Sequence, residues 1–421
     1  MRLPDPRLCA RCRGRGLCGL SYCPVISRAI ALAKLGNIRL GRELFGSSPP
    51  SVFVGRVGYP YVNVGPSVPP ERGDTRIYDF PEAWLDIDIN RVIGYRMSLV
   101  TGSTKAKVYD AHNRLAQELQ ELALSSSPVD VELQLAKEPK PRIAFSEYEP
   151  PQGPRAPLER LRVAGNPKVP RPVEKAYQDG DLRAVEAVVM LYESGIPVTH
   201  IQKLLSVGAL GLYKRRRLVP TRWSITAVDD IVSQHLISKV KRYEPLDSVE
   251  VYVRRTHDNL FIAVLLPQRW SYEWMEAWWP GSTWNAYGSE VVVEGDHEGY
   301  RGRWEYPDIG GCYFAARLAT AEFLYRRRRQ AAVILLREIY PGFNIPIGVW
   351  FVRENVRRMF LQPPALRTTD MREVVELLDR ETRLGARRWL EASRILQREL
   401  AVRKLTDYLQ AGGRKAGGVL R

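Results

Sequence analysis

The sequence predicts an α+β protein, with a small amino-terminal metal knuckle on a mixed α/β body and a mainly helical carboxy-terminal region. Three observations lead to this prediction. Four of the five cysteines fall between residues 9 and 23. Valine and aromatic residues alternate with glycine and proline over residues 47–70, which is typical of short strands and tight turns. From about residue 369 onward, apolar residues recur at helical spacing among many charges.

The composition indicates a folded protein with a polyanionic partner. A chain of 421 residues exceeds one ordinary core, so we expect two or three domains. Lysine and arginine outnumber aspartate and glutamate by 63 to 47, which gives a net charge of +16. Such an excess attracts nucleic acid, because bound phosphates release their counterions. An arginine-rich thermophile surface is the alternative explanation.

The chain shows no sign of membrane insertion or export. It has no apolar run of eighteen residues, and its amino terminus lacks the apolar core of a secretory signal. We therefore expect a cytoplasmic protein with no membrane partner. That compartment argues against disulfides.

The cysteines at the amino terminus follow the pattern C-x2-C-x5-C-x4-C. Four thiolates at such spacing form a closed tetrahedral site, which suits a structural zinc ion. The five-residue gap is shorter than in a zinc ribbon, and a proline follows the last cysteine as in ferredoxins, so an iron–sulfur cluster is the alternative. The predicted ligands are Cys9, Cys12, Cys18 and Cys23.

Arginines accompany this cysteine segment and the glycine-rich segment that follows it. Arg11, Arg13 and Arg15 share the cysteine loop, where a metal would hold them toward phosphates. Arg56 stands between Gly55 and Gly58, and a glycine-rich turn beside an arginine suits a phosphate. The segment is neither a Walker loop nor a dinucleotide fingerprint, and turns within a β-sheet explain it equally.

The middle of the chain combines irregular and helical segments. Ten prolines between residues 126 and 174 predict a proline-stiffened strap, with one strand pattern at VDVELQLA. Helices are expected from Asp181, from Thr199 and over SITAVDDIVSQHLISKV. Trp270, Trp274 and Trp278 recur every four residues, which predicts one helical face. Those rings serve either as an aromatic core or as a platform for unpaired bases.

Two runs of four cations predict phosphate contacts. Four adjacent cations point in all directions around a helix or turn, so they cannot all pair with neighbours. The second run lies within a helix expected over residues 313–338. The predicted contacts are Lys214, Arg215, Arg216, Arg217 and Arg222 in the first group, and Arg326, Arg327, Arg328 and Arg329 in the second.

Catalytic chemistry is less defined. Asp86 and Asp88 would share one face of a strand, as metal-binding nuclease carboxylates do, and Asp229 is followed by Asp230. Solvent-facing alternation explains the first pair equally well. No spacing specifies a reaction, so we assign no enzymatic activity. A metal-dependent repair enzyme (nuclease or nucleotide-modifying) and an RNA-associated zinc protein remain alternatives.

The carboxy-terminal tail contains a motif like those that bind sliding clamps. Leu405, Tyr408 and Leu409 have the spacing of a one-turn hydrophobic plug. Val402 stands where such motifs begin with glutamine, and an ordinary amphipathic helix end is the alternative.

Together these segments resemble the Nre family of archaeal DNA repair proteins. The resemblance covers nearly the whole chain and rests on the four-cysteine start, SPPSVFVGRVGYPYVNVGP, GNPKVP, RRRLVPTRWSITAVDD, GGCYFAARLA and the tail motif. It implies a protein of the DNA damage response with a C4 zinc site, a tail that docks on the sliding clamp (PCNA), and two family regions that meet near residue 285.

The resulting interpretation is a DNA repair protein that binds DNA through its basic clusters and docks on the clamp. We expect a zinc-knuckle segment at residues 1–30 and an Nre-like amino-terminal domain at 31–285. A helical carboxy-terminal domain with the clamp-binding tail would occupy 286–421.

Overall fold

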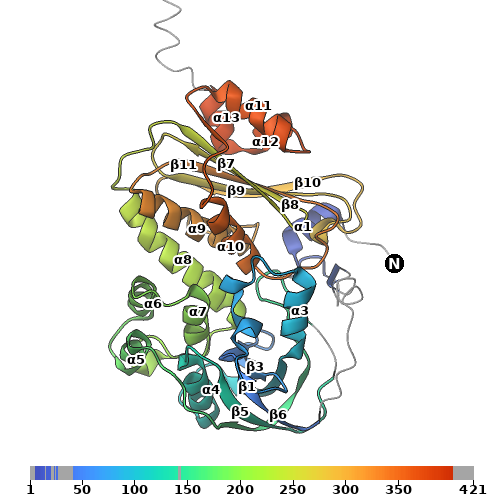
Figure 1. The fold of residues 1–421 in the computed structure, drawn as a ribbon, viewed down its shortest axis with the longest axis vertical. Helices are drawn as coiled ribbons and strands as arrows, with labels where there is room; N and C mark the ends of the chain where they lie inside the picture. The colour runs from blue at the N-terminus through green and yellow to red at the C-terminus, as the bar shows by residue number, and fades with distance from the viewer. Residues whose placement is uncertain are drawn as a thin grey trace, which may run out of the picture.

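The computed structural model describes residues 5–14, 16–19, 23, 25–26, 41–140 and 144–401. Two six-stranded mixed sheets dominate it, so the predicted α+β class is confirmed. Figure 1 shows the first sheet at one end of the molecule and the second sheet toward the other, with a layer of helices between them. None of the helices in the described part of the chain is long and apolar enough to cross a membrane.

The first sheet has the strand order β1-β5-β6-β4-β3-β2. Its neighbours are antiparallel except for β4 and β6, which run parallel. In β5, residues Val129, Val131, Leu133 and Leu135 are buried while their neighbours are not, the alternation of a strand with one face on a core. The strands are β1 (Glu43–Ser48), β2 (Ser51–Val54), β3 (Tyr61–Val68), β4 (Val100–Lys107), β5 (Val129–Leu135) and β6 (Arg155–Val163).

The strands expected over residues 47–70 and at VDVELQLA are therefore confirmed. The proline-rich segment 126–174 is less irregular than predicted, because β5 and β6 both lie inside the first sheet. Helices pack around this sheet and beside it: α3 (Ile89–Ser98), α4 (Arg114–Leu124), α5 (Arg171–Gln178), α6 (Ala184–Glu193) and α7 (Val198–Ser206).

The second sheet has the order β10-β9-β11-β8-β7-β12. Helices α9 (Cys312–Arg327) and α10 (Trp350–Met359) share a core with one face of it, together with α8 (Thr221–Val240). Helices α11 (Met371–Glu381), α12 (Ala386–Ala392) and α13 (Arg394–Ala401) cover the other face (Figure 1). The strands are β7 (Val249–Thr256), β8 (Asn259–Leu266), β9 (Ser271–Trp278), β10 (Val292–Glu298), β11 (Ala332–Ile339) and β12 (Leu366–Thr368).

The prediction of a mainly helical carboxy-terminal region is wrong, because three strands of the second sheet lie after residue 285. The helix expected over 313–338 ends at Arg327, and the apolar run that follows is strand β11. Every residue of β11 is buried because helices cover both faces of the sheet. A short apolar run without alternation fits a buried strand and a buried helix equally well. The predicted boundary near residue 285 falls between β9 and β10, which pair in one sheet.

The tryptophan series is also strand rather than helix. Trp274 and Trp278 lie in β9, and Trp270 directly precedes it. All three side chains are buried, so they form core and are not available to bases. A spacing of four residues returns to the same side of a strand as well as of a helix.

The predicted metal knuckle is not seen as a formed unit. The described part of the amino terminus contains helix α1 (Pro6–Cys12), which begins at the capping residue Asp5 and packs against β10 and the short helix η4 (Thr283–Asn285). Within the described residues, no three His, Cys, Asp or Glu side chains are grouped as a metal ion requires.

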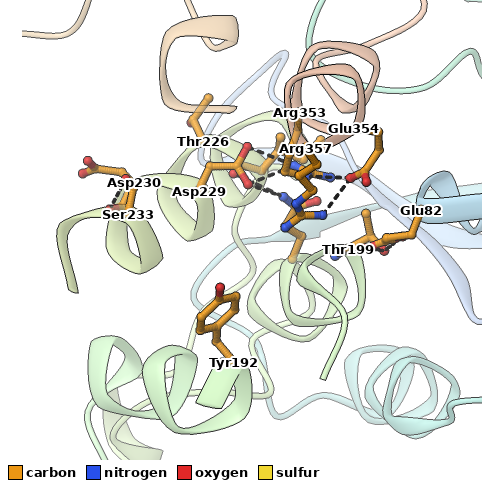
Figure 2. A network of polar contacts seen from close by, with 12 residues as sticks. Glu82, Tyr192, Thr199, Thr226, Asp229, Asp230, Ser233, Arg353, Glu354 and Arg357 are labelled. Carbon is orange, nitrogen blue, oxygen red and sulfur yellow. Dashed lines mark hydrogen bonds and ion pairs between the residues drawn. The ribbon is translucent and has the colours of Figure 1, made fainter. Parts of the chain in front are cut away.

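Buried ion pairs join the helices between the two sheets (Figure 2). Arg353 of α10 donates to Asp229 of α8 at 2.9 Å, and both side chains are inaccessible to solvent. Arg357 bridges Glu354 and Glu322 at 2.8 and 2.7 Å. Paired charges of this kind fix one arrangement of the helices, because separating them leaves a charge buried and unpaired.

We expect Arg353→Met to destabilise the protein strongly, because Asp229 then stays buried without its cation. The free energy of unfolding should fall by roughly 3–5 kcal/mol, as for other broken buried pairs. Urea unfolding followed by circular dichroism measures this change. Replacing Asp229 by Asn in the same chain should restore part of the loss.

The matched control is Arg372→Gln. Arg372 pairs with Asp370 on the exposed start of α11, where solvent screens the interaction. Its replacement should leave the unfolding midpoint nearly unchanged. An equal loss of unfolding free energy in both variants would show that the Arg353–Asp229 pair stabilises the protein no more than an exposed pair does.

Candidate nucleic-acid interface

Five segments of the chain meet around a cavity of about 240 Å³ at the start of α8. They are the turn between β2 and β3 with its flanking strand residues, residues 145–155, the first residues of α8, the residues directly after α1, and Ile26. The backbone N–H of Val54, the last residue of β2, donates to the Thr221 hydroxyl at 3.0 Å, which fixes β2 against the helix start. We call this cavity the arginine pocket, after Arg56, Arg155 and Arg222, which line it.

The glycine-rich turn places Arg56 on the pocket wall. The N–H of Gly55 donates to the carbonyl of Asn63 at 2.7 Å, which continues the strand pairing up to Arg56. Gly58 has a φ of +85°, and a Cβ there would lie 2.8 Å from the carbonyl oxygen of Tyr61. Only glycine fits such a position without strain. The turn that sequence reasoning left open as sheet or phosphate site is thus a sheet turn that borders a basic cavity.

Two further arginines are oriented by aromatic rings. The Arg155 guanidinium lies 4.1 Å from the centre of the Phe53 ring, and its Nε is buried without a hydrogen-bond partner. The Arg222 guanidinium lies 3.6 Å from the centre of the Tyr148 ring. Stacking on a ring holds a guanidinium plane in place while its N–H groups remain able to bind oxygen atoms.

One carboxylate stands among these cations. Glu149 accepts from the backbone N–H of Arg222 and from Nε2 of Gln152, the latter at 2.9 Å. Burial raises the pKa of Glu149, although Arg155, Arg222 and Arg56 oppose the rise. Three arginines therefore face a single carboxyl group that other donors already occupy.

The arginines also repel one another. Burial lowers the pKa of Arg56, and the neighbouring positive charge of Arg222 lowers it further. Burial likewise lowers the pKa of Arg155, against the attraction of Glu149. An anion in the pocket would relieve this repulsion and would give the unpartnered Nε of Arg155 an acceptor.

Arg13 borders the pocket, but its side chain is buried and its charge is paired inside the protein. Its guanidinium lies 2.6 Å from Glu147 and 2.8 Å from Glu276, and it donates to Sγ of Cys312 at 3.2 Å. The prediction that Arg13 contacts phosphate is wrong, because its side chain is buried and its charge is paired. It anchors the cysteine segment to the second sheet instead.

Arg11 pairs with Asp308 at 2.9 Å on the surface, while Arg15 lies outside the described residues. Of the predicted metal ligands, Cys12 is buried, and Cys9, Cys18 and Cys23 are half-buried. Burial and the three other thiols raise the pKa of Cys9 to about 12. The N–H of Leu17 donates to Sγ of Cys12 at 3.2 Å. The thiols thus lie near one another but not at metal-binding geometry, and zinc or an iron–sulfur cluster stays a prediction.

The first cation run divides into surface and interior residues. It begins in the short helix η3 (Tyr213–Arg215) and places Lys214, Arg215 and Arg217 on the surface. Arg216 points inward, where its guanidinium donates to the carbonyls of Gly211 at 3.0 Å and Tyr177 at 2.7 Å. Within the described chain, none of the three surface cations has a carboxylate within ion-pair distance.

The second cation run lies at the far end of α8. Lys239, near the end of α8, lies over the ring of Tyr325, and Tyr325 directly precedes the second run at the end of α9. Because α8 has 20 residues and rises about 1.5 Å per residue, the two runs are roughly 30 Å apart. Arg327 pairs with Glu250 at 3.0 Å and Arg329 with Asp247 at 3.8 Å.

Arg326 and Arg328 are exposed at the carboxyl end of α9, where arginines also stabilise the helix dipole. Phosphate contact by this second run stays a prediction.

The candidate catalytic carboxylates do not converge. Asp88 caps the start of α3, which replaces the predicted strand, and Asp86 pairs with Arg358. Asp229 and Asp230 point to different helices, toward Arg353 and Arg317 respectively. The helix cap and the ion pairs give these carboxylates structural roles. The clamp-motif residues Leu405, Tyr408 and Leu409 lie outside the described residues.

Comparison with known proteins identifies the family to which this chain belongs. Residues 17–285 match the model of the archaeal Nre amino-terminal region, and residues 298–408 match that of the archaeal Nre carboxy-terminal region. The chain therefore belongs to the archaeal Nre family, which confirms the resemblance inferred from its motifs. No solved structure matches this chain.

Relatives in this family carry repair names. The chain is 47% identical over 390 residues to the DNA repair protein NreB of Archaeoglobus fulgidus, covering 93% of this chain and 97% of the relative. It is 36% identical to the DNA repair protein NreA of the same organism, over 90% of this chain and 98% of the relative. The DNA repair protein NreA of Haloferax volcanii is 38% identical over 76% of this chain and 79% of its own length.

Sequence reasoning missed Arg155 and Glu149 and found Arg56 and Arg222 without linking them. Arg155 and Glu149 lie in the proline-rich segment, and neither belongs to a charge run or a motif. Only the folded chain brings residues 56, 149, 155 and 222 to one place.

Proposed function

We propose that this protein is a DNA repair protein that binds DNA and holds a backbone phosphate in the arginine pocket. The observation that carries the proposal is the convergence of Arg56, Arg155 and Arg222 on one cavity that contains a single, already hydrogen-bonded carboxylate. The repair names of relatives that span nearly the whole chain support the biological setting.

The chemistry of the pocket favours phosphate over other anions. Guanidinium groups bind phosphate oxygens through paired N–H donors, and three of them surround a volume suited to a small anion. The net charge of +16 attracts the phosphate backbone over longer distances. Surface cations Lys214, Arg215 and Arg217 add further contacts outside the pocket.

We expect Arg56→Gln and Arg222→Gln each to weaken DNA binding and to lower its dependence on salt. Each lost phosphate contact should reduce the slope of log affinity against log salt by about one. Fluorescence anisotropy with a labelled oligonucleotide at several salt concentrations measures both quantities.

Arg388→Gln is the matched control for the pocket. Arg388 is an exposed arginine on α12, which covers the opposite face of the second sheet. Its loss removes the same charge without touching the pocket. If all three variants lower the slope equally, net charge alone accounts for the binding and the pocket assignment fails.

We also propose that the tail docks on the sliding clamp through Leu405, Tyr408 and Leu409. The support is the spacing of one aliphatic residue followed by two bulky residues three and four positions later. Leu405→Ala combined with Tyr408→Ala should abolish capture of this protein by immobilised PCNA while DNA affinity stays unchanged. Retained capture would remove the tail from the interface.

We further propose that Cys9, Cys12, Cys18 and Cys23 bind one structural zinc ion. The support is the C-x2-C-x5-C-x4-C spacing, which supplies four thiolates within fifteen residues. The ion would brace the segment that Arg13 anchors to the second sheet.

Metal analysis of the purified protein should give about one zinc per chain, as for a four-cysteine site, and none in a Cys9→Ser, Cys12→Ser variant. Visible absorption together with bound iron would instead assign an iron–sulfur cluster. Cys312→Ser is the control, because Cys312 lies outside the four-cysteine pattern and its loss should leave the metal content unchanged.

A further inference from the structure

We propose that the arginine pocket opens onto a track of alternating aromatic rings and cations that binds an unpaired DNA strand. This inference rests on the proposed function, because it assumes that the pocket holds a DNA phosphate. The track runs from the turn between β2 and β3, past the end of β4, to the first cation run. Its rings are Tyr59, Trp223, Tyr109 and Tyr213, and its cations are Lys107, Arg217, Lys214 and Arg215.

The track begins at a pair of exposed rings next to the pocket. The rings of Tyr59 and Trp223 lie 5.2 Å apart at an angle of 50°. Their exposed fractions are 42% and 44%, although aromatic side chains of this size are usually buried. Trp223 directly follows the pocket residue Arg222, and Tyr59 lies in the same turn as Arg56. A phosphate in the pocket would therefore place its neighbouring nucleotide beside these rings.

Backbone hydrogen bonds connect this pair to the next group. The N–H of Val108 donates to the carbonyl of Pro60 at 2.9 Å, and the N–H of Leu218 donates to the carbonyl of Val108 at 2.8 Å. The turn, the end of β4 and the first cation run therefore lie side by side. The pocket and the surface cations belong to one continuous face.

A second exposed ring on that face has two cations close to it. Tyr109 is 52% exposed, and both Lys107 and Arg217 lie over its ring, at 5.9 and 5.7 Å from the centre. Asp110 follows and reduces the positive charge of this part of the track by one. A base stacked at this ring would have two cations within reach of its phosphates.

The track ends at the first cation run. Tyr213 is 56% exposed, and its ring lies 4.5 Å from that of His112. Lys214 and Arg215 follow directly and are exposed without carboxylate partners in the described structure. The inward-pointing Arg216 lies 5.7 Å from the Tyr213 ring and holds the segment in position.

Alternation of rings and cations matches an unpaired strand better than a duplex. In a duplex the base faces are stacked inside and only edges and phosphates are accessible, so exposed rings have nothing to stack upon. In a single strand every base offers a face, and stacking on an aromatic side chain contributes about 1–3 kcal/mol per base. Repair exposes such strands at gaps, ends and lesions.

The test compares labelled single-stranded dT of about 20 nucleotides, long enough for one binding site, with a duplex of equal length. We expect Trp223→Ala and Tyr109→Ala each to weaken single-strand binding about tenfold, as one lost stacking contact does. Duplex binding should change little. Trp223→Phe keeps a ring and should restore most of the affinity.

Trp304→Ala is the matched control. Trp304 is 99% exposed but lines a different cavity, beside Glu294 and Asp296. Its loss should leave both affinities unchanged, and thermal unfolding verifies that each variant is folded. Equal losses for duplex and single strand, or no loss at all, would overturn the track.

Other outcomes separate this inference from the function on which it rests. If the wild-type protein binds neither DNA form, the proposed DNA binding itself is wrong. If the wild-type protein binds DNA, and Arg56→Gln weakens this binding while Trp223→Ala does not, the pocket assignment is supported and the track is overturned. Tighter binding of a uridine oligonucleotide of equal length would assign the track to RNA and overturn the DNA proposal.

Discussion

The ion pair between Asp229 and Arg353 is the interaction on which the arrangement of this protein most depends. It holds α8 against α10 in the layer between the two sheets, where neither charge reaches solvent. Helix α8 starts at the first sheet, where Arg222 lines the pocket, and extends along α9 beneath the second sheet. Since a buried unpaired charge costs several kcal/mol, alternative positions of α8 are strongly disfavoured. The pocket is therefore positioned in part by an ion pair about two turns further along the same helix.

The chain uses its arginines in two ways that composition does not distinguish. Arg13, Arg317 and Arg353 are buried and paired with carboxylates, so they contribute to the net charge count but present nothing to a ligand. Arg56 and Arg222 lie close together at a cavity wall, where each positive charge disfavours the other. A net charge of +16 predicts a polyanionic partner. Only the burial and the ion pairs of each side chain show which cations are accessible to such a partner.

The sequence predicts much of this fold where periodicity and position agree, and fails where two structures share one pattern. Alternation over residues 47–70 and 129–135 is found as strands, and the run after Pro220 is found as helix α8. The spacing of Trp270, Trp274 and Trp278 fits a helix and a strand alike, and only pairing with β10 and β11 decides for the strand. No local sequence pattern predicts the pocket. Its arginines are 99 and 67 positions apart, and topology alone makes them neighbours.

An arginine pocket of this kind has a local cost in stability, which the anion that we propose for it would offset. Arg155 holds a buried Nε without an acceptor, and Arg56 and Arg222 share a region with too little negative charge. Burying an unsatisfied donor costs about 1–3 kcal/mol, which a purely structural site would avoid. Proteins keep such local costs where function needs them. The exposed rings on the same face also have a local cost, because Tyr59 and Trp223 leave apolar surface in water unless another group stacks on them. The unpaired cations and the exposed rings are adjacent on one surface, and the nucleotide strand that we propose as ligand would contact both.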